Sequence, residues 1–355
     1  MKRLVITLAL AAVLLVGLAA PAGASAAVWQ PSTVATFSAG DYGSFLEGMA
    51  ADSHGDLYGA LTTWGYYDET VDPSLWGSNI GEVWRVPRNG KTKLVATLDL
   101  SPNGMFCGAA VDGADRVYVA TYDFGDPQTV GCGVYRVGPG GSMVKVVALP
   151  AGSWPNGLAV HDGRAYITDC ASGAVWRARL SGSVAEPAAP WLQDALLAGG
   201  DPTVDETAWG IGANGIAFRG DGLFVSVSDF GRIVRIQVKS DGAPGAPRVV
   251  CEKPELKSAD GIAFDAAGGL WITVNAGTTG ASPAGALYRL MPSGALRQLA
   301  DDPGWLNYPT VPVFGTAKGA MHTLFIANGA FYGYEDGSVP DIQALPAGVD
   351  GLRLK

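Results

Sequence analysis

The sequence predicts an all-β fold, a six-bladed β-propeller with four antiparallel strands in each blade. A short pattern, one residue followed by Gly and an apolar run, recurs every 46 to 60 residues, a period typical of propellers and solenoids. A turn and a second apolar run follow each copy, as expected of consecutive antiparallel strands. The chain also has 50 Gly, 22 Pro and only 16% charged residues, which favours many short strands over helical bundles.

The first residues are expected to lie outside this fold. Lys2 and Arg3 are positive, residues 4–20 are apolar, and small residues follow up to Ala27. These are the features of a secretory signal peptide, so we expect residues 1–27 to be removed, leaving 28–355 as a single propeller domain. The alternative is an uncleaved membrane anchor. We expect a secreted protein, either released or retained in a periplasm or cell wall, without membrane association after cleavage because no other segment could span a bilayer.

A strand that begins the mature chain is expected to close the ring. Residues 34–37 resemble the outermost strand of a blade but precede the first copy of the pattern. We expect them to pair with the last blade, formed by residues 324–328 and the C-terminal segment. Closure removes the exposed sheet edges that invite aggregation.

One repeat, residues 214–252, illustrates the expected blade. Turn residues separate its apolar and alternating runs, and the four expected strands are 215–218, 223–227, 232–238 and 248–251. Third strands that each contain an aromatic residue followed by Arg are expected in the other blades at 81–86, 133–137, 173–178 and 286–290.

The bulk composition limits the partners. The hydrophobic fraction of 48% is ample for a large core, and the net charge of −9 without a basic block argues against nucleic acid. We expect a monomer that acts on a small molecule. Four Cys in an exported chain suggest two disulfides, with Cys107–Cys132 preferred; the alternative is that Cys107 is simply a small buried residue.

The residue before the glycine changes from blade to blade in a chemically informative way. It is, in order, Glu47, Cys107, Asn156, Asn214, Asp260 and, in a weaker sixth copy, Phe314. A propeller brings equivalent positions together around its axis, and four of these six residues are oxygen donors of the kind that bind Ca²⁺. The alternative is that Asn-Gly and Asp-Gly only form turns.

The segments around these donors resemble a known family. Phe45-Leu46-Glu47-Gly48, Trp154-Pro155-Asn156-Gly157, Ala213-Asn214-Gly215 and Ala259-Asp260-Gly261 resemble the calcium-dependent six-bladed propellers of the senescence-marker-protein, gluconolactonase and paraoxonase group. The resemblance covers nearly the whole mature chain. It implies that Glu47, Asn156, Asn214 and Asp260 are metal ligands, and that Asp260 is also the general base or nucleophile of a hydrolase.

The expected mouth of the channel is apolar. Cys107, Phe314, Trp154 and Trp209 are the candidate substrate-pocket residues, and they favour a less polar ester or lactone over a sugar lactone. The three His fall in or near the turns between first and second strands, on the opposite face, which argues against His-based catalysis.

Two classes of function follow from this pattern. The first is a secreted Ca²⁺-dependent hydrolase of lactones or related esters. The second is a non-catalytic propeller that binds a ligand or partner and holds a structural Ca²⁺. A lyase or synthase like the strictosidine synthase relatives is less favoured, because the sixth blade has no axial Glu.

Overall fold

The computed structural model describes residues 31–38, 40–65, 77–123, 131–180, 185–201, 210–275, 285–331, 337–348 and 351. From Pro31 onward the chain forms one compact unit. The signal peptide expected at residues 1–27 lies outside the described residues. Within the described part, no helix is both long enough and apolar enough to cross a membrane.

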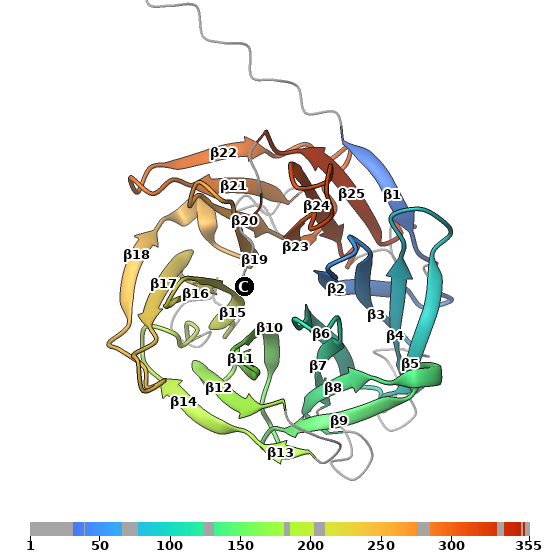
Figure 1. The fold of residues 1–355 in the computed structure, drawn as a ribbon, viewed down its shortest axis with the longest axis horizontal. Helices are drawn as coiled ribbons and strands as arrows, with labels where there is room; N and C mark the ends of the chain where they lie inside the picture. The colour runs from blue at the N-terminus through green and yellow to red at the C-terminus, as the bar shows by residue number, and fades with distance from the viewer. Residues whose placement is uncertain are drawn as a thin grey trace, which may run out of the picture. The chain divides into compact units, whose positions relative to one another are not determined.

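The described strands form six sheets arranged as blades around a central axis (Figure 1), so the predicted six-bladed β-propeller is confirmed. The strands of the first three blades follow the chain from the axis outward. Blade 1 contains β2 (Ser44–Ala51), β3 (Leu57–Thr63), β4 (Ile80–Val86) and β5 (Lys93–Asp99). Blade 2 contains β6 (Gly104–Val111), β7 (Val117–Asp123), β8 (Gly133–Val137) and β9 (Met143–Ala148). Blade 3 contains β10 (Pro155–His161), β11 (Arg164–Asp169), β12 (Ala174–Arg179) and β14 (Ala189–Gln193).

The last three blades repeat this order. Blade 4 contains β15 (Ala213–Arg219), β16 (Gly222–Val227), β17 (Arg232–Gln237) and β18 (Arg248–Glu252). Blade 5 contains β19 (Ala259–Phe264), β20 (Leu270–Val274), β21 (Ala286–Leu290) and β22 (Leu296–Ala300). Blade 6 contains β23 (Pro309–Phe314), β24 (Thr323–Asn328), β25 (Asp341–Pro346) and the N-terminal strand β1 (Ser32–Thr36).

The ring is closed by strands from near the two ends of the described chain. β1 pairs antiparallel with β25, and Ser32 lies opposite Ala344. The predicted closing strand is therefore confirmed, with its start two residues earlier than expected. A short strand, β13 (Glu186–Pro187), leaves blade 3 and pairs in parallel with β9, so blade 2 gains a fifth strand.

Burial decreases from the axis outward and explains the sequence patterns of the strands. Every residue of β20 is buried, and its sequence Leu-Trp-Ile-Thr-Val is a nearly continuous apolar run. In the outermost strand β18, only Cys251 is buried. The inner strands are covered on both faces by neighbouring blades, which is the condition that produces unbroken apolar runs.

The hydrophobic core consists of clusters that join neighbouring blades. Val134 of blade 2 and Ile167 of blade 3 belong to one cluster, and Ile233 of blade 4 and Ile272 of blade 5 belong to another. Each blade is therefore stabilised mainly by burial of apolar area against the next.

The cysteines are part of this packing. All four are buried free thiols, so the expected Cys107–Cys132 disulfide is not formed, and the alternative of small buried residues describes them. The Cys132 thiol instead donates to the Ser153 carbonyl oxygen at 3.1 Å.

Candidate functional site: an axial ring of oxygen donors

All six innermost strands contain a β-bulge at the same place. In each bulge, two residues of the innermost strand lie opposite one residue of the second strand, and such an insertion re-aims a side chain. The bulged pairs are Glu47-Gly48, Cys107-Gly108, Asn156-Gly157, Asn214-Gly215, Asp260-Gly261 and Thr310-Val311. The innermost strands surround the axis (Figure 1), so these bulges form a ring of equivalent side-chain positions.

The glycine of the pair in blades 1 to 5 is required by the contact between blades. A Cβ atom added at Gly48 would lie 2.2 Å from the Cys107 carbonyl oxygen, and one added at Gly215 would lie 2.2 Å from the Asp260 carbonyl oxygen. Either separation is a severe clash. These Asn-Gly and Asp-Gly pairs also lie inside strands, so the interpretation that they only form turns is wrong.

Buried hydroxyls of the second strands fix the backbone of the axial residues. Thr168 donates to the Asn214 carbonyl oxygen, and Ser226 donates to the Asp260 carbonyl oxygen at 2.6 Å. Thr273 makes the equivalent bond to Thr310 at 2.7 Å. These bonds tie blades 3, 4, 5 and 6 to one another directly behind the ring and so hold the bulges in place.

The structure corrects the expected sixth axial residue. In blade 6 the bulge lies at Thr310-Val311, so Thr310, and not Phe314, occupies the position equivalent to Asp260. Phe314 lies at the other end of β23, opposite Leu324, and its ring contacts Trp271 edge-on at 5.7 Å. The Gly315 that follows Phe314 suggested the wrong register. Phe314 therefore does not join the axial ring.

The four expected donors occupy the ring, and two of them touch. Asn156 Nδ2 donates to Glu47 Oε1 at 2.9 Å, across the axis from blade 3 to blade 1. Glu47, Asn214 and Asp260 are each at most 6% exposed. Asn156 is half-buried. The site is therefore polar but largely excluded from bulk water.

The two carboxylates of the ring are in an unusual electrostatic environment. Burial raises the pKa of Glu47 to about 7, although the hydrogen bond from Asn156 opposes the shift. Burial and the nearby charge of Glu47 raise the pKa of Asp260 well above its usual value, against a hydrogen bond from Asn275. No lysine or arginine contributes to either shift, so nothing among these contributions compensates two neighbouring negative charges.

The donor set fits a hard cation. Glu47 Oε2 and Asn214 Oδ1 are buried and have no hydrogen-bond partner, although buried polar atoms are almost always paired. A cation held by carboxylate and amide oxygens would satisfy both atoms and both charges. Among the described residues, no group of three or more His, Cys, Asp or Glu could hold a metal, so an ion here would need the amide oxygens as well.

Two of the other expected pocket residues, Cys107 and Trp154, lie in the ring or next to it. Cys107 occupies the axial position of blade 2 with no exposed surface, and burial raises the pKa of its thiol well above the usual value. Trp154 directly precedes β10, and its ring contacts Tyr122 edge-on at 5.9 Å. Trp209 lies outside the described residues. Cys107 and the Trp154 ring thus add apolar surface beside the donor Asn156 on the side of blades 2 and 3.

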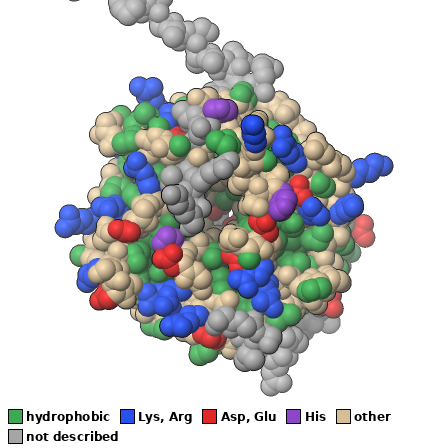
Figure 2. All heavy atoms as spheres, in the orientation of Figure 1, with side chains coloured by type: hydrophobic (Ala, Val, Ile, Leu, Met, Phe, Trp, Pro, Cys, Tyr) green, Lys and Arg blue, Asp and Glu red, His purple; other side chains and the backbone are tan. Residues whose placement is uncertain are grey.

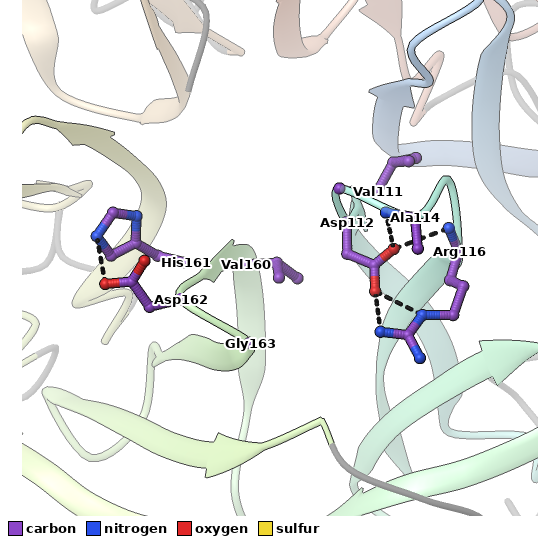
Figure 3. Close-up of a pocket in the computed structure, with 9 residues that line it drawn as sticks. Val111, Asp112, Ala114, Arg116, Val160, His161, Asp162 and Gly163 are labelled. Carbon is purple, nitrogen blue, oxygen red and sulfur yellow. Dashed lines mark hydrogen bonds and ion pairs between the residues drawn. The ribbon is translucent and has the colours of Figure 1, made fainter. Parts of the chain in front are cut away.

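The opposite ends of the same strands form a different surface. Figure 2 shows histidine side chains around the hollow of that face. A cavity of about 410 Å³ lies there, and Figure 3 shows Asp112 and Arg116 on one side of it and His161 and Asp162 on the other. Asn156 and His161 are near opposite ends of β10, at about 3.3 Å per residue. His161 therefore cannot reach the ring.

Two functional candidates were missed in the sequence. Ser228 accepts a hydrogen bond from Asn214 Nδ2 at 3.0 Å, and Asn275 donates to Asp260 Oδ2 at 3.1 Å. Each directly follows a second strand, and this regular position was the available signal. Asp169, the last residue of β11, accepts a hydrogen bond from the backbone of Ala171 in an Asx turn.

Comparison with known proteins supports the architecture. The family described as "SMP-30/Gluconolactonase/LRE-like region" matches residues 196–329, which include Asn214 and Asp260. The family resemblance inferred from the sequence is thereby confirmed. None of the curated proteins compared with this chain gives a significant match.

Several solved structures share the fold. A gluconolactonase from Xanthomonas campestris is 18% identical, with a TM-score of 0.56 over 90% of this chain and 91% of its own. A PQQ-bound aldose sugar dehydrogenase from Streptomyces coelicolor is 15% identical, with a TM-score of 0.56 over 89% and 98%. A virginiamycin B lyase from Staphylococcus aureus is 15% identical, with a TM-score of 0.50 over 90% and 99%. These proteins have different activities, so the likeness establishes the fold alone.

Proposed function

We propose that this chain is a secreted, Ca²⁺-dependent hydrolase that opens lactones or cleaves related esters. The observation that supports the proposal best is the pair of buried oxygens without partners, Glu47 Oε2 and Asn214 Oδ1, in a ring that also holds Asp260 and Asn156. The match of residues 196–329 to a family that includes gluconolactonases agrees with this chemistry.

Glu47, Asn156, Asn214 and Asp260 would hold the cation. When bound, Ca²⁺ supplies Lewis-acid polarisation of the substrate carbonyl oxygen. The positive charge would also oppose the burial that raises the pKa of Asp260, and so would favour its ionised carboxylate.

Asp260 can then act in one of two ways. As a general base, it takes one proton from a water molecule, and the water oxygen adds to the carbonyl carbon. The bond from that carbon to the alkoxide oxygen then breaks, and the alkoxide takes the proton from Asp260. As a nucleophile, its carboxylate adds to that carbon and expels the alkoxide, and water later cleaves the resulting anhydride. Both routes yield a carboxylic acid and an alcohol, which remain in one molecule when the substrate is a lactone.

The ring also controls access of water. Asp260 is 4% exposed, and the half-buried Trp154 lies where the chain enters blade 3. A largely dehydrated carboxylate interacts more strongly with a polarised carbonyl than an exposed one would. The apolar surface that Cys107 and Trp154 add favours esters and lactones with little charge.

The test compares the mature chain with Asp260→Asn. We expect calorimetry to detect one Ca²⁺ site in the wild type, and a panel of lactones and aryl esters to reveal Ca²⁺-dependent turnover. Asp260→Asn should reduce kcat/KM by about 10³-fold because it removes the base or nucleophile.

Asp112→Asn is the matched control. Asp112 follows an innermost strand at the opposite face and is engaged with Arg116, so the variant should retain both turnover and Ca²⁺ affinity. Ca²⁺ binding without turnover would instead favour a non-catalytic propeller with a structural ion. Absence of Ca²⁺ binding would reject the proposal.

A further inference from the structure

Ser228 and Asn275 occupy the same place in blades 4 and 5. Each follows the second strand of its blade, and its backbone N–H donates to the residue just before the innermost strand. Ser228 donates to the Gly212 carbonyl oxygen at 3.2 Å, and Asn275 donates to the Ser258 carbonyl oxygen at 3.1 Å. Both side chains are therefore presented to the axial residue of their own blade from a fixed backbone.

The hydrogen bonds of Ser228 fix the direction of the Asn214 amide. The single hydroxyl proton of Ser228 is donated to the Ala259 carbonyl oxygen at 2.7 Å. Ser228 Oγ can then only accept from Asn214, which assigns Nδ2 to that contact. Asn214 Oδ1 must point the other way, and it is the oxygen that is buried without a partner.

Asn275 orients the Asp260 carboxylate in an analogous way. Its Nδ2 donates to Oδ2 of the carboxylate at 3.1 Å. This bond holds the carboxylate plane and occupies one lone pair of one oxygen. The second oxygen, Oδ1, is left for a ligand or a proton.

We propose that Ser228 and Asn275 are positioning residues that each direct one oxygen, Asn214 Oδ1 and Asp260 Oδ1, toward a bound Ca²⁺. The inference rests on the proposed function, because it concerns the same cation. Hydrogen-bond partners of metal ligands commonly change metal affinity by 10- to 100-fold when removed.

The positioning role is separable from the bond between blades. Cys170 occupies the equivalent place in blade 3, and its thiol donates to the Ala213 carbonyl oxygen at 3.2 Å, just as Ser228 donates to Ala259. The axial Asn156 of that blade instead donates to Glu47. A thiol at this place therefore maintains the contact between blades without holding an axial amide.

The experiment measures the Ca²⁺ dissociation constant by calorimetry and the melting temperature in EDTA. Ser228→Ala and Asn275→Ala should each weaken Ca²⁺ binding by about 10-fold. Ser228→Cys reproduces the blade 3 arrangement, so it should fold like the wild type and still lose affinity, because a thiol is a weak acceptor for the Asn214 amide. Ser228→Thr, which keeps the hydroxyl, should restore affinity.

Thr273→Val is the control for a purely structural effect. It removes a buried hydroxyl that also bridges two blades but touches no axial side chain, so it should lower the melting temperature without changing Ca²⁺ affinity. The proposal is overturned if Ser228→Cys and Asn275→Ala bind Ca²⁺ as tightly as the wild type does. If the wild type itself binds no Ca²⁺, the proposed function and this inference both fail.

Discussion

Asp260 and Asp265 lie at opposite ends of the same innermost strand, and their surroundings differ completely. Asp265 is fully buried and accepts hydrogen bonds from Arg289 Nε, Trp271 Nε1 and the Gly269 backbone, each at 2.8 Å. Asp260 is almost as buried, but among the described residues its carboxylate accepts a side-chain hydrogen bond from Asn275 alone, and its pKa is raised well above the usual value.

The difference separates a structural carboxylate from a functional one. A buried charge is tolerated when its partners are built into the fold, as at Asp265. At the axial end, nearby Glu47 adds repulsion rather than compensation. Burial of two carboxylates in such an environment is expected where a cation supplies the missing charge.

The largest loss of stability should come from removing the structural carboxylate, Asp265. Asp265→Asn leaves the Arg289 guanidinium, 17% exposed, without its counter-charge. We expect the free energy of unfolding in urea to fall by about 3 kcal/mol, with Ca²⁺ affinity unchanged. Asp260→Asn, measured in EDTA, should show no such loss, and equal destabilisation by both variants would contradict the distinction.

The carboxylates at the axial ring should make the stability of the apoprotein depend on pH. In the unfolded chain Glu47 titrates near its ordinary value of 4.5, whereas in the folded apoprotein its pKa is about 7. The folded state therefore binds more protons between these values, and the stability of the apoprotein falls as pH rises from about 4.5 to about 7. Melting temperatures in EDTA should follow this trend, while saturating Ca²⁺ should reduce it over the same pH interval. Glu47→Gln should reduce the slope of the EDTA profile, although the raised pKa of Asp260 keeps part of it. A slope unaffected by the substitution would assign it to other groups.

The smallest effect should come from an exposed ion pair at the turn end. Burial alone would raise the pKa of Asp112, but hydrogen bonds from Arg116 lower that pKa below its usual value. The Arg116 side chain is 48% exposed, so water and salt weaken the pair. Arg116→Gln should lower the free energy of unfolding by less than about 1 kcal/mol, and chemical denaturation at two salt concentrations would measure it. A loss of stability as large as that of Asp265→Asn would show that the burial of an ion pair does not determine how much it contributes.

The sequence was most informative where one physical requirement repeats in every blade. The glycine after Glu47, Asn156, Asn214 and Asp260 is needed for contact with the next blade, and its recurrence located the axial donors. The closing strand was recognisable for a similar reason, because its pattern matches an outermost strand without a blade of its own.

The prediction failed where a bulge is formed without the glycine that marks it in the other blades. In blade 6 the pair at the bulge is Thr310-Val311, which has no glycine, and the Gly315 further along gave a false match at Phe314. Ser228 and Asn275 were missed because their roles depend on contacts between strands and not on a local motif. The Cys107–Cys132 disulfide was expected from composition, which does not specify the distances between side chains.

The pairing of β1 with β25 has a consequence for how this molecule is made. The last blade takes one strand from residues 32–36 and three from residues 309–346. A chain emerging from its amino terminus must hold β1 unpaired until almost all of the polypeptide is available, and contacts of such long sequence separation form slowly. Until then blade 6 is incomplete and its open edge can pair with another chain. The pairing of β1 with β25 is therefore the folding step most sensitive to truncation near the carboxyl terminus and to crowding by other nascent copies.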